Sequence, residues 1–410
     1  MPIIHSLLDT DFYKFTMGQV VHRLYPDVDV AYGFKNRTAT VKLADFISEK
    51  ELRFELDWAK TLRFTASELE YLRSIKRTDG KAMFDEDYLR FLSDVSLPNY
   101  DLRVVDGRFE LEFRSPWQTA IYWETLALSI INELYYRAMT GNMSIDERAD
   151  FITEGTIRLN RKIIELLESP HVKFIEFGTR RRFSGSWQNN VVIELAKHLP
   201  ENLSGTSNVL IAMKHGLKPI GTMAHEMFMV CSALASADDE ELRKSHNKVL
   251  VEWEANYAHD LLVALTDTFG TDFFFSDMTR KQAKMWSGLR QDSGNPIEFG
   301  EKAIAFYQRH GINPLTKILV FSDGLNVERI IEIANHFHGR INVLFGWGTN
   351  LTNDLGFMSL SLVVKATMTN GNGTVKLSDN LAKAMGAPED IEQYRRVFGY
   401  DVDYSEKCVY

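Results

Sequence analysis

The chain has little cysteine: only Cys231 and Cys408 occur among its 410 residues, and no C-x-x-C motif is present. A disulfide framework and a cysteine-based zinc site are therefore excluded. Cys231 lies in an apolar run that predicts a helix. Scarce cysteine without pairing motifs is typical of a reducing compartment, so we expect a cytoplasmic protein.

Long hydrophobic runs are also lacking. Residues 1–5 show no basic region followed by a long apolar core, so we expect no secretory signal there. The most apolar stretch, residues 117–139, carries Glu124, Glu133 and Arg137, which predicts a buried helix and not a membrane span. We expect no membrane partner. Low-complexity segments and short repeats are absent as well.

A surplus of basic charge is missing. Lys and Arg number 47 against 56 Asp and Glu, a net charge of -9. This balance argues against a broad nucleic-acid surface and leaves room for a local basic pocket, so we expect no nucleic-acid partner. The 45% hydrophobic content, on the other hand, supplies a sizeable core for one large or two ordinary domains.

After Pro170, short apolar runs alternate with helical segments. Repeated strand–helix units pack as parallel strands with right-handed crossovers. They favour a β/α barrel over residues 141–365, with an open doubly wound sheet as the alternative. The predicted strands are residues 172–177, 218–222, 272–275, 318–321 and 342–345. The predicted helices between them are residues 207–215, 249–269, 296–310 and 326–337.

Residues 1–140 show a different pattern and predict an N-terminal α/β domain. Residues 28–34 alternate like a strand, and residues 101–113 predict a strand pair around Asp106-Gly107. Beyond this domain, Ser144 with Glu147 three positions later forms a capping box that begins a long amphipathic helix. We expect the C-terminal segment, from about 366 to 410, to pack back on the N-terminal domain.

His225 follows the apolar residues 218–222 at the predicted start of a helix. Groups at the carboxyl ends of barrel strands form the active site, and neutral imidazole can act as base or nucleophile near pH 7. A hydrogen-bonded structural histidine is the alternative for this residue taken alone. The second histidine of a zinc-binding H-E-x-x-H helix is missing, and we predict no metal site from a side-chain motif.

Two further strand ends suit phosphate and ribose. Arg290 offers a planar fork for a carboxylate or phosphate, and Asp292 suits paired ribose hydroxyls. Gly348, Thr349 and Asn350 form a turn of small residues whose backbone amides can approach an anion. This turn is neither a Walker A loop nor a Rossmann fingerprint. Ordinary tight turns remain the alternative at both places.

Charged residues at other strand ends complete the candidates. Asp277 and Asp323 each close an apolar run, where a carboxylate can orient a histidine, hold magnesium, bind sugar hydroxyls or cap a helix. Arg180 begins a basic triplet that suits phosphate in an otherwise acidic protein.

These motifs, in this order and spacing, resemble the nicotinate phosphoribosyltransferases, a type II phosphoribosyltransferase family. The resemblance covers nearly the whole chain, from residues 8–14 to residues 375–379. Its most specific parts are Glu176-Phe177-Gly178-Thr179-Arg180-Arg181, Gly205-Thr206-Ser207-Asn208, Gly221-Thr222-Met223-Ala224-His225-Glu226, Arg290-Gln291-Asp292-Ser293-Gly294 and Phe345-Gly346-Trp347-Gly348-Thr349-Asn350. The apolar-Asp-Asp signature of the purine-type phosphoribosyltransferases is absent.

The resemblance implies a fold and a reaction. The fold is an irregular, TIM-like and quinolinate-phosphoribosyltransferase-like (β/α) barrel with an N-terminal α/β domain. The reaction converts nicotinate and phosphoribosyl pyrophosphate into nicotinate mononucleotide and pyrophosphate, a step of NAD salvage. ATP hydrolysis is coupled to it through a phosphorylated His225, and Mg²⁺ accompanies the phosphates. The resemblance also implies a homodimer with shared active sites.

The resemblance assigns a role to each candidate residue. His225 carries the phosphoryl group, and Asp277 orients its ring. Phe177 lies against the pyridine ring, whose other face is covered by Tyr13 of the second subunit. The remaining implied roles are phosphate contact by Arg180, a clamp on the nicotinate carboxylate or a phosphate by Arg290, ribose binding by Asp292, Asp323 and Gly324, and 5′-phosphate binding by Gly348, Thr349 and Asn350.

Ser207 bears on the choice between the acid and the amide. The nicotinamide-using relatives carry an Asp at the matching position, which accepts from the amide and would repel a carboxylate. A serine can donate to a carboxylate, so Ser207 favours nicotinate. A nicotinamide phosphoribosyltransferase and a non-catalytic metabolite-binding protein on the same fold remain the alternatives, with a quinolinate enzyme as a weaker one.

Overall fold

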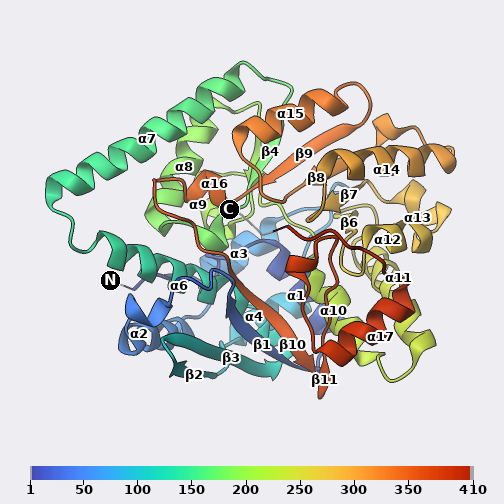
Figure 1. Ribbon diagram of the computed structural model, residues 1–410, viewed down its shortest axis with the longest axis horizontal. Coiled ribbons are helices and arrows are strands. Elements are labelled where there is room, and N and C mark those ends of the chain that lie inside the picture. The colour runs from blue at the N-terminus through green and yellow to red at the C-terminus, as the bar shows by residue number, and fades with distance from the viewer. Residues whose placement is uncertain (1, 407–410) are drawn as a thin grey trace.

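The computed structural model describes residues 2–406 of the chain and contains two sheets (Figure 1). Cys408 lies outside the described residues. One sheet is antiparallel and has five strands; the other is parallel and has six. None of the described helices is long and apolar enough to span a bilayer.

The antiparallel sheet combines both ends of the chain. Its order is β11-β10-β1-β3-β2, so β1, from the N-terminal part, pairs with β10 on one side and β3 on the other. The predicted strand pair is confirmed as β2 and β3, joined by Asp106 and Gly107 with positive φ. The strand bounds are Asp29–Asn36 for β1, Tyr100–Val105 for β2, Arg108–Pro116 for β3, Leu362–Thr369 for β10 and Asn372–Gly373 for β11.

Helices cover this sheet and connect it to the second one. The apolar stretch predicted as one helix is divided into α5 and α6 by a turn at Ile121 and Tyr122. Residues 123–136 of α6 are all buried because the helix packs on β10 and on the short helix η2 (Thr179–Arg181). The N-terminal helices are α1 (Tyr13–Leu24), α2 (Glu49–Thr61), α3 (Ala66–Ser74), α4 (Glu86–Asp94), α5 (Trp117–Ala120) and α6 (Trp123–Thr140).

The parallel sheet is an irregular barrel, as predicted. Its order is β5-β4-β9-β8-β7-β6. Residues 218–222 do not form a strand, but Pro219 bridges to Thr206 of β5, and the Thr222 hydroxyl donates to Val263 O of β6. This segment therefore lies between the two outer strands. The bounds are Phe174–Glu176 for β4, Leu203–Thr206 for β5, Val263–Leu265 for β6, Gly288–Gln291 for β7, Ile318–Phe321 for β8 and Asn342–Trp347 for β9.

Helices alternate with these strands. The capping box of Ser144 and Glu147 is present at the start of α7. Helix α10 begins at His225, as predicted. The bounds are α7 Ile145–Leu167, α8 Gly185–His198, α9 Val209–His215, α10 His225–Leu234, α11 Asp239–Tyr257, α12 Thr271–Asp277, α13 Arg280–Met285, α14 Pro296–Arg309, α15 Val327–Phe337, α16 Thr349–Thr352 and α17 Pro388–Phe398.

Besides the missing strand at residues 218–222, two predicted elements of the repeat are wrong. The strand predicted at residues 272–275 is helix α12, and the helix predicted at 249–269 ends at Tyr257 and is followed by β6. A distant group decides the first case, because the Asp379 carboxylate accepts from Thr271 N (2.8 Å) and caps the start of α12. In the second case Ala258 and Leu261 take positive φ values of 53° and 57°, which ends the helix.

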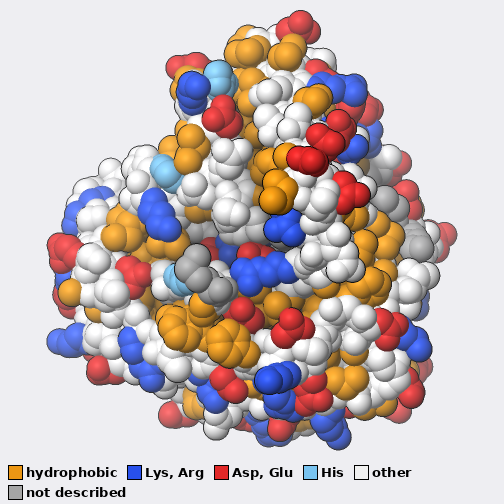
Figure 2. All heavy atoms as spheres, turned by 90° about the vertical axis from the view of Figure 1, so that its left-hand side faces the viewer, with side chains coloured by type: hydrophobic (Ala, Val, Ile, Leu, Met, Phe, Trp, Pro, Cys, Tyr) orange, Lys and Arg blue, Asp and Glu red, His pale blue; other side chains and the backbone are white. Residues whose placement is uncertain are grey.

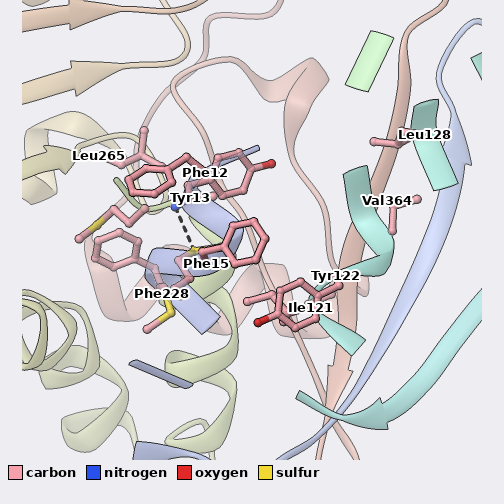
Figure 3. Close-up of a cluster of buried hydrophobic side chains, with 14 of the residues drawn as sticks. Phe12, Tyr13, Phe15, Ile121, Tyr122, Leu128, Phe228, Leu265 and Val364 are labelled. Carbon is pink, nitrogen blue, oxygen red and sulfur yellow. Dashed lines mark hydrogen bonds between the residues drawn. The ribbon is translucent and has the colours of Figure 1, made fainter. Parts of the chain in front are cut away.

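The two sheets share one hydrophobic core (Figure 3). Strand β10 straddles residue 365, the predicted domain boundary, and α17 packs on α11, so the C-terminal segment contacts both parts of the fold. The core side chains labelled in Figure 3 are Phe12, Tyr13, Phe15, Ile121, Tyr122, Leu128, Phe228, Leu265 and Val364.

Candidate active site

The carboxyl ends of β4, β7, β8 and β9 meet at one small pocket. Parallel strands direct these ends to the same side of the sheet, so residues more than one hundred positions apart become neighbours. The pocket brings together eight of the predicted site residues: Phe177, Arg180, Arg290, Asp292, Gly324, Gly348, Thr349 and Asn350.

His225 lies beside this pocket, joined to it through Asp292. Its Nε2 is 3.0 Å from Asp292 Oδ2, and its Nδ1 is 3.0 Å from the Thr268 hydroxyl. Because an ionised carboxylate can only accept, a neutral ring in this setting carries its proton on Nε2 and accepts from Thr268 at Nδ1. Both ring nitrogens are therefore held, and the imidazole plane is fixed.

The charges around His225 keep the ring neutral. Burial lowers its pKa to about 4, and the nearby Lys376 ammonium acts in the same direction, while Asp267 and Asp292 oppose it. Burial would raise the pKa of Asp292, but Arg290 and the hydrogen bond from His225 hold it well below the ordinary value. Near pH 7 the pair is thus a neutral imidazole beside an ionised carboxylate.

The prediction that Asp277 orients His225 is wrong. Asp277 ends α12, and its carboxylate binds His246 Nδ1 at 2.7 Å and the Asn247 amide. The partner of His225 besides Asp292 is instead Asp267, whose Oδ1 lies 3.9 Å from Nε2. A strand at residues 272–275 would place Asp277 at the same edge of the sheet as Asp292, but these residues form α12.

Two charged residues beside His225, Asp267 and Lys376, are not among those predicted from the sequence. Asp267 is fully buried and follows β6, and Oδ2 accepts from the Ser293 hydroxyl and lies 3.8 Å from Lys376 Nζ. Burial lowers the pKa of Lys376 to about 8. The sequence marks both only weakly: Asp267 follows the very short apolar run 263–265, and Lys376 lies in the last segment that carries the family resemblance, with nothing local to connect either to His225.

Two aromatic rings form a parallel pair at the same place. The rings of Tyr13 and Phe177 are 6.2 Å apart between centroids, at 3° to one another. The guanidinium of Arg180 lies 5.9 Å from the Tyr13 centroid, and that of Arg290 lies 5.8 Å from the Phe177 centroid. A planar ring can lie between them only if their planes stand about 7 Å apart, since each of its two stacking contacts takes about 3.5 Å.

The prediction that this tyrosine comes from a second subunit is wrong. Tyr13 of the same chain stacks on Phe177, is only 2% exposed, and donates to Glu124 Oε2 at 3.3 Å. The described chain therefore supplies both rings itself.

Ser207 is buried behind this ring pair and does not line the pocket. Its hydroxyl donates to Asp11 Oδ1 at 2.7 Å, and Asp11 Oδ2 lies 3.5 Å from Arg180 Nε. Burial raises the pKa of Asp11, against the effect of Arg180. Ser207 would have to turn away from Asp11 before it could donate to a substrate carboxylate.

Asp323 belongs to an adjoining, larger cavity of about 670 Å³, which Gly324 shares with the small pocket. Its carboxylate accepts from Lys383 Nζ, which also donates to Asp292 O at 2.8 Å. Burial raises the pKa of Asp323, and Lys383 opposes that effect. Lys383 thus ties the two predicted ribose-binding residues to one another.

The turn between β9 and α16 approaches β4 closely. A Cβ on Gly348 would lie 2.9 Å from Phe177 O, so this position has no room for a side chain. The Asn350 amide donates to Leu325 O at 3.0 Å, and Asn350 O accepts from Lys162 of α7. The turn is therefore fixed in place with its backbone facing the pocket.

The chain also has a group of residues that suits a divalent cation. One ligand atom each from His225, Asp267 and Asp292 lie within 4.8 Å of one another. Asp267 Oδ1 has no hydrogen-bond partner within the described part of the chain. A buried carboxylate oxygen in that state, beside a second carboxylate, matches the oxygen ligands that Mg²⁺ prefers.

A buried ion network joins α10 to the N-terminal domain. Glu226, next to His225, accepts from Lys14 Nζ at 2.6 Å, from the Tyr32 hydroxyl at 2.6 Å and from Trp117 Nε1 at 2.7 Å. Lys14 also lies 2.7 Å from Glu124. Burial would lower the pKa of Lys14, but the two carboxylates raise it above the ordinary value. The first turn of α10 is thus anchored from outside the barrel.

The chain matches two descriptions of one protein family. Residues 172–402 match the nicotinate phosphoribosyltransferase (NAPRTase) family, and residues 8–132 match the N-terminal domain of the same family.

Solved structures agree with these matches over almost the full length. The nicotinate phosphoribosyltransferase from Vibrio cholerae is 33% identical, with a TM-score of 0.86 over 98% of this chain and 95% of that one. The nicotinate phosphoribosyltransferase from Porphyromonas gingivalis is 32% identical, with a TM-score of 0.86 over 97% of this chain and 100% of that one. A putative nicotinate phosphoribosyltransferase from Saccharomyces cerevisiae is 30% identical, with a TM-score of 0.85 over 98% of this chain and 99% of that one.

Proposed function

We propose that this chain, which belongs to the nicotinate phosphoribosyltransferase family, forms nicotinate mononucleotide and pyrophosphate from nicotinate and phosphoribosyl pyrophosphate. ATP hydrolysis is coupled to the reaction through phosphorylation of His225, and the product enters NAD salvage. The observation that carries this proposal is the meeting of Arg290, Asp292 and the Gly348 turn in one pocket, with His225 bonded to Asp292.

The ring pair supports a planar anionic substrate. Tyr13 and Phe177 are parallel rings suited to stack on a pyridine ring, and the guanidinium groups of Arg180 and Arg290 lie within 6 Å of their centroids, close enough to neutralise a carboxylate. The amide nicotinamide lacks the charge that two guanidinium groups favour. A comparison of the two substrates in the same assay tests this preference.

Glycosyl transfer needs positioning more than a strong base. The bond from C1′ to the pyridine nitrogen forms as the bond from C1′ to the pyrophosphate oxygen breaks, through an oxocarbenium-like state. We assign ribose hydroxyls to Asp292 and Asp323, and the 5′-phosphate to the backbone and side chains of Gly348, Thr349 and Asn350. Fixed donors and carboxylates of this kind stabilise developing charge without rearranging.

His225 is suited to accept a phosphoryl group. Its low pKa leaves the ring neutral and nucleophilic near pH 7. If the N–P bond forms at Nε2, the ring proton must stand on Nδ1, which then donates to Thr268, so that Nε2 holds the lone pair. That lone pair attacks the γ-phosphorus as the bond from this phosphorus to the ADP oxygen breaks and ADP departs; Asp292 and Asp267 lie 3.0 Å and 3.9 Å from Nε2. Asp267 and Asp292 would also hold Mg²⁺, which, when bound, neutralises phosphate charge. We also propose a homodimer as the assembly.

Product formation tests the reaction. Purified protein with nicotinate, phosphoribosyl pyrophosphate and Mg²⁺ should yield nicotinate mononucleotide, and ATP should raise the yield. A protein that forms no mononucleotide from either nicotinate or nicotinamide would contradict a catalytic role and favour a metabolite-binding one.

Labelling with γ-phosphate-labelled ATP tests the histidine and its partner. The wild type should incorporate label, and His225→Ala should not; label retained by this variant would place the acceptor elsewhere. Asp267→Asn should slow labelling about 10²-fold or more, since the ring loses a carboxylate partner. Asp277→Asn is the matched control and should label at nearly the wild-type rate, because Asp277 binds His246.

A further inference from the structure

Lys162 is a buried lysine on a helix at the outside of the molecule. Figure 1 shows α7 along the upper left edge, and Figure 2, which views that side, shows Lys and Arg side chains scattered over the surface. The preceding residue, Arg161, is of this ordinary kind, with a side chain that is 74% exposed. The side chain of Lys162 is only 10% exposed, and burial lowers its pKa, although Asp354 opposes that effect. Burial of an ammonium group costs free energy that an apolar side chain would not, so a lysine at this position indicates a specific role.

The ammonium group of Lys162 binds the turn between β9 and α16. Its Nζ donates to Asn350 O at 2.6 Å and lies 2.7 Å from Asp354 Oδ2. The ring of Trp347, the last residue of β9, has its centroid 5.8 Å from the same Nζ. Lys162 is not among the residues that line the pocket, whereas Asn350 is. Any effect of Lys162 on a ligand in the pocket is therefore transmitted through the turn.

Two peptide groups connect this contact to the pocket. Lys162 donates to the carbonyl oxygen of Asn350. The N–H of the same peptide group, that of Leu351, donates to Gly348 O at 3.0 Å. The next peptide group joins Gly348 O to the N–H of Thr349, which begins α16 and, like the first N–H groups of any helix, has no acceptor within that helix. Hydrogen bonds in such a chain polarise one another, so a cation at one end makes the N–H at the other end a stronger donor.

Two other side-chain contacts that hold this turn are uncharged. The Asn350 amide donates to Leu325 O at 3.0 Å, and the Thr352 hydroxyl donates to Gly178 O at 3.4 Å. A hydrogen bond from a charged donor is shorter and roughly twice as strong as one between neutral groups. Of these three contacts, the one from Lys162 therefore fixes the turn most firmly.

We propose that Lys162 is a positioning residue for the 5′-phosphate: from α7 it holds and polarises the turn whose amides bind that group. This role rests on the proposed function, which assigns the 5′-phosphate to Gly348, Thr349 and Asn350. A phosphate dianion gains more from a polarised N–H than an uncharged group does. Lys162 should therefore matter for ligands that carry the 5′-phosphate and have little effect on ligands that lack it.

Calorimetric binding of two ligands to the full chain separates this role from a general structural one. Nicotinate mononucleotide carries the 5′-phosphate and nicotinate riboside lacks it, so the Kd of the riboside divided by that of the mononucleotide measures the phosphate preference. Lys162→Met should lower this preference about 10-fold or more, because the charged contact behind the turn is lost. Lys162→Arg keeps a charged donor and should retain most of it. Partial unfolding reduces the amount of competent protein for both ligands alike and leaves the preference unchanged.

Arg161→Met is the matched control, since it removes a charge from the adjacent, exposed position of α7 and should leave the phosphate preference unchanged. If Lys162→Met does not fold, Lys162→Gln gives the same comparison, and its preference should also fall because the charge is gone. An unchanged preference in the Met or Gln variant, or affinities for both ligands that fall equally, overturns the role of Lys162.

The wild type separates this role from the proposed function. A wild type without a preference for the mononucleotide overturns the assignment of the 5′-phosphate and the role of Lys162 with it. A wild type that prefers the mononucleotide but does not synthesise it contradicts the proposed reaction alone, and the comparison of variants still decides the role of Lys162.

Discussion

At the scale of single residues, the chemistry centres on how His225 is kept uncharged among carboxylates. Asp267 and Asp292 would ordinarily favour a protonated ring, but burial outweighs them and Lys376 adds positive charge nearby. The ring therefore stays neutral near pH 7 even though two carboxylates lie beside it. A nucleophile that avoids protonation keeps its lone pair over a wide pH range.

This balance predicts an unusual pH dependence. A histidine with the ordinary pKa of 6.5 is only about 3% neutral at pH 5, and its labelling would fall about 30-fold from the neutral plateau. With a pKa of about 4, His225 stays mostly neutral at pH 5 and loses reactivity only as the pH approaches 4. The initial rate of phosphoryl incorporation, measured from pH 4 to 8, should show this acid limb.

Removing Lys376 should move that limb. Lys376→Met takes away a charge that lowers the pKa of His225, so the acid limb should shift upward toward 6.5. Lys248→Met is the control, since Lys248 lies on α11 with its side chain 64% exposed. An acid limb that is equal in all three proteins would show that Lys376 does not act on the ring.

Some of these residues could be found from the sequence and others could not. His225, Arg290 and Asp292 stand in contiguous motifs with glycine beside them, so local chemistry points to them. Asp267 follows a strand of only three residues, which no periodicity separates from the preceding helix. Lys376 acts from a segment more than one hundred residues after His225, and only the fold brings it there.

At the scale of elements, the turn after β9 shows how backbone shape makes a binding surface. Glycine is the only residue type that fits at position 348, because a Cβ there would lie only 2.9 Å from Phe177 O. The turn connects directly to the strand that pairs with β4, so the amides to which we assign the 5′-phosphate and the ring of Phe177 are positioned by the same pair of strands.

Gly348→Ala should therefore affect substrate binding more than stability. The added methyl group pushes the turn away from Phe177, and we expect KM for phosphoribosyl pyrophosphate to rise about 10-fold, because well-placed phosphate donors are lost. Gly339→Ala is the control: Gly339 has a positive φ of 71° in the loop before β9 and open space around it. It should cost about 1 kcal/mol of stability and leave KM unchanged. Steady-state kinetics and thermal unfolding separate the two effects.

The errors at this scale share a cause. Residues 273–275 are three phenylalanines, a run whose composition favours a strand. They lie in helix α12 instead, whose N-terminus is capped by the carboxylate of Asp379, about one hundred residues away. The real strands β5, β6 and β7 have only three or four residues each. The capped helix α14 and the wholly apolar strand β8 agree closely with their predicted bounds because their signals are local.

At the scale of the whole molecule, the active site depends on contacts between the two sheets. The helix that presents His225 is held by Lys14 and Tyr32 through Glu226, and both belong to the N-terminal domain. The barrel alone therefore does not fix the position of His225.

Breaking this ion pair should destabilise the chain strongly. Lys14→Met leaves Glu226 and Glu124 buried without their shared cation, and we expect a loss of about 3–5 kcal/mol. The double variant Lys14→Met with Glu226→Gln should lose less than the sum of the single changes. Lys244→Met, at the exposed pair with Glu240, should change stability by less than about 1 kcal/mol. Urea unfolding gives the stability of these three variants and of Glu226→Gln alone. Losses of the two single variants that add up to the loss of the double variant would contradict a direct interaction between Lys14 and Glu226.

The pairing of β1 with β10 has a consequence for how the protein is made. β1 ends at residue 36, and β10 begins at residue 362, in the centre of the same sheet. A ribosome that adds about 5–20 residues per second needs roughly 15–65 s between the two. During that time β1 presents a bare edge next to a finished β2–β3 hairpin, the kind of edge on which other chains can pair. A strand that is synthesised more than 300 residues later thus completes the sheet to which β1 belongs, and we expect the N-terminal domain to reach its full sheet only after β10 has been made.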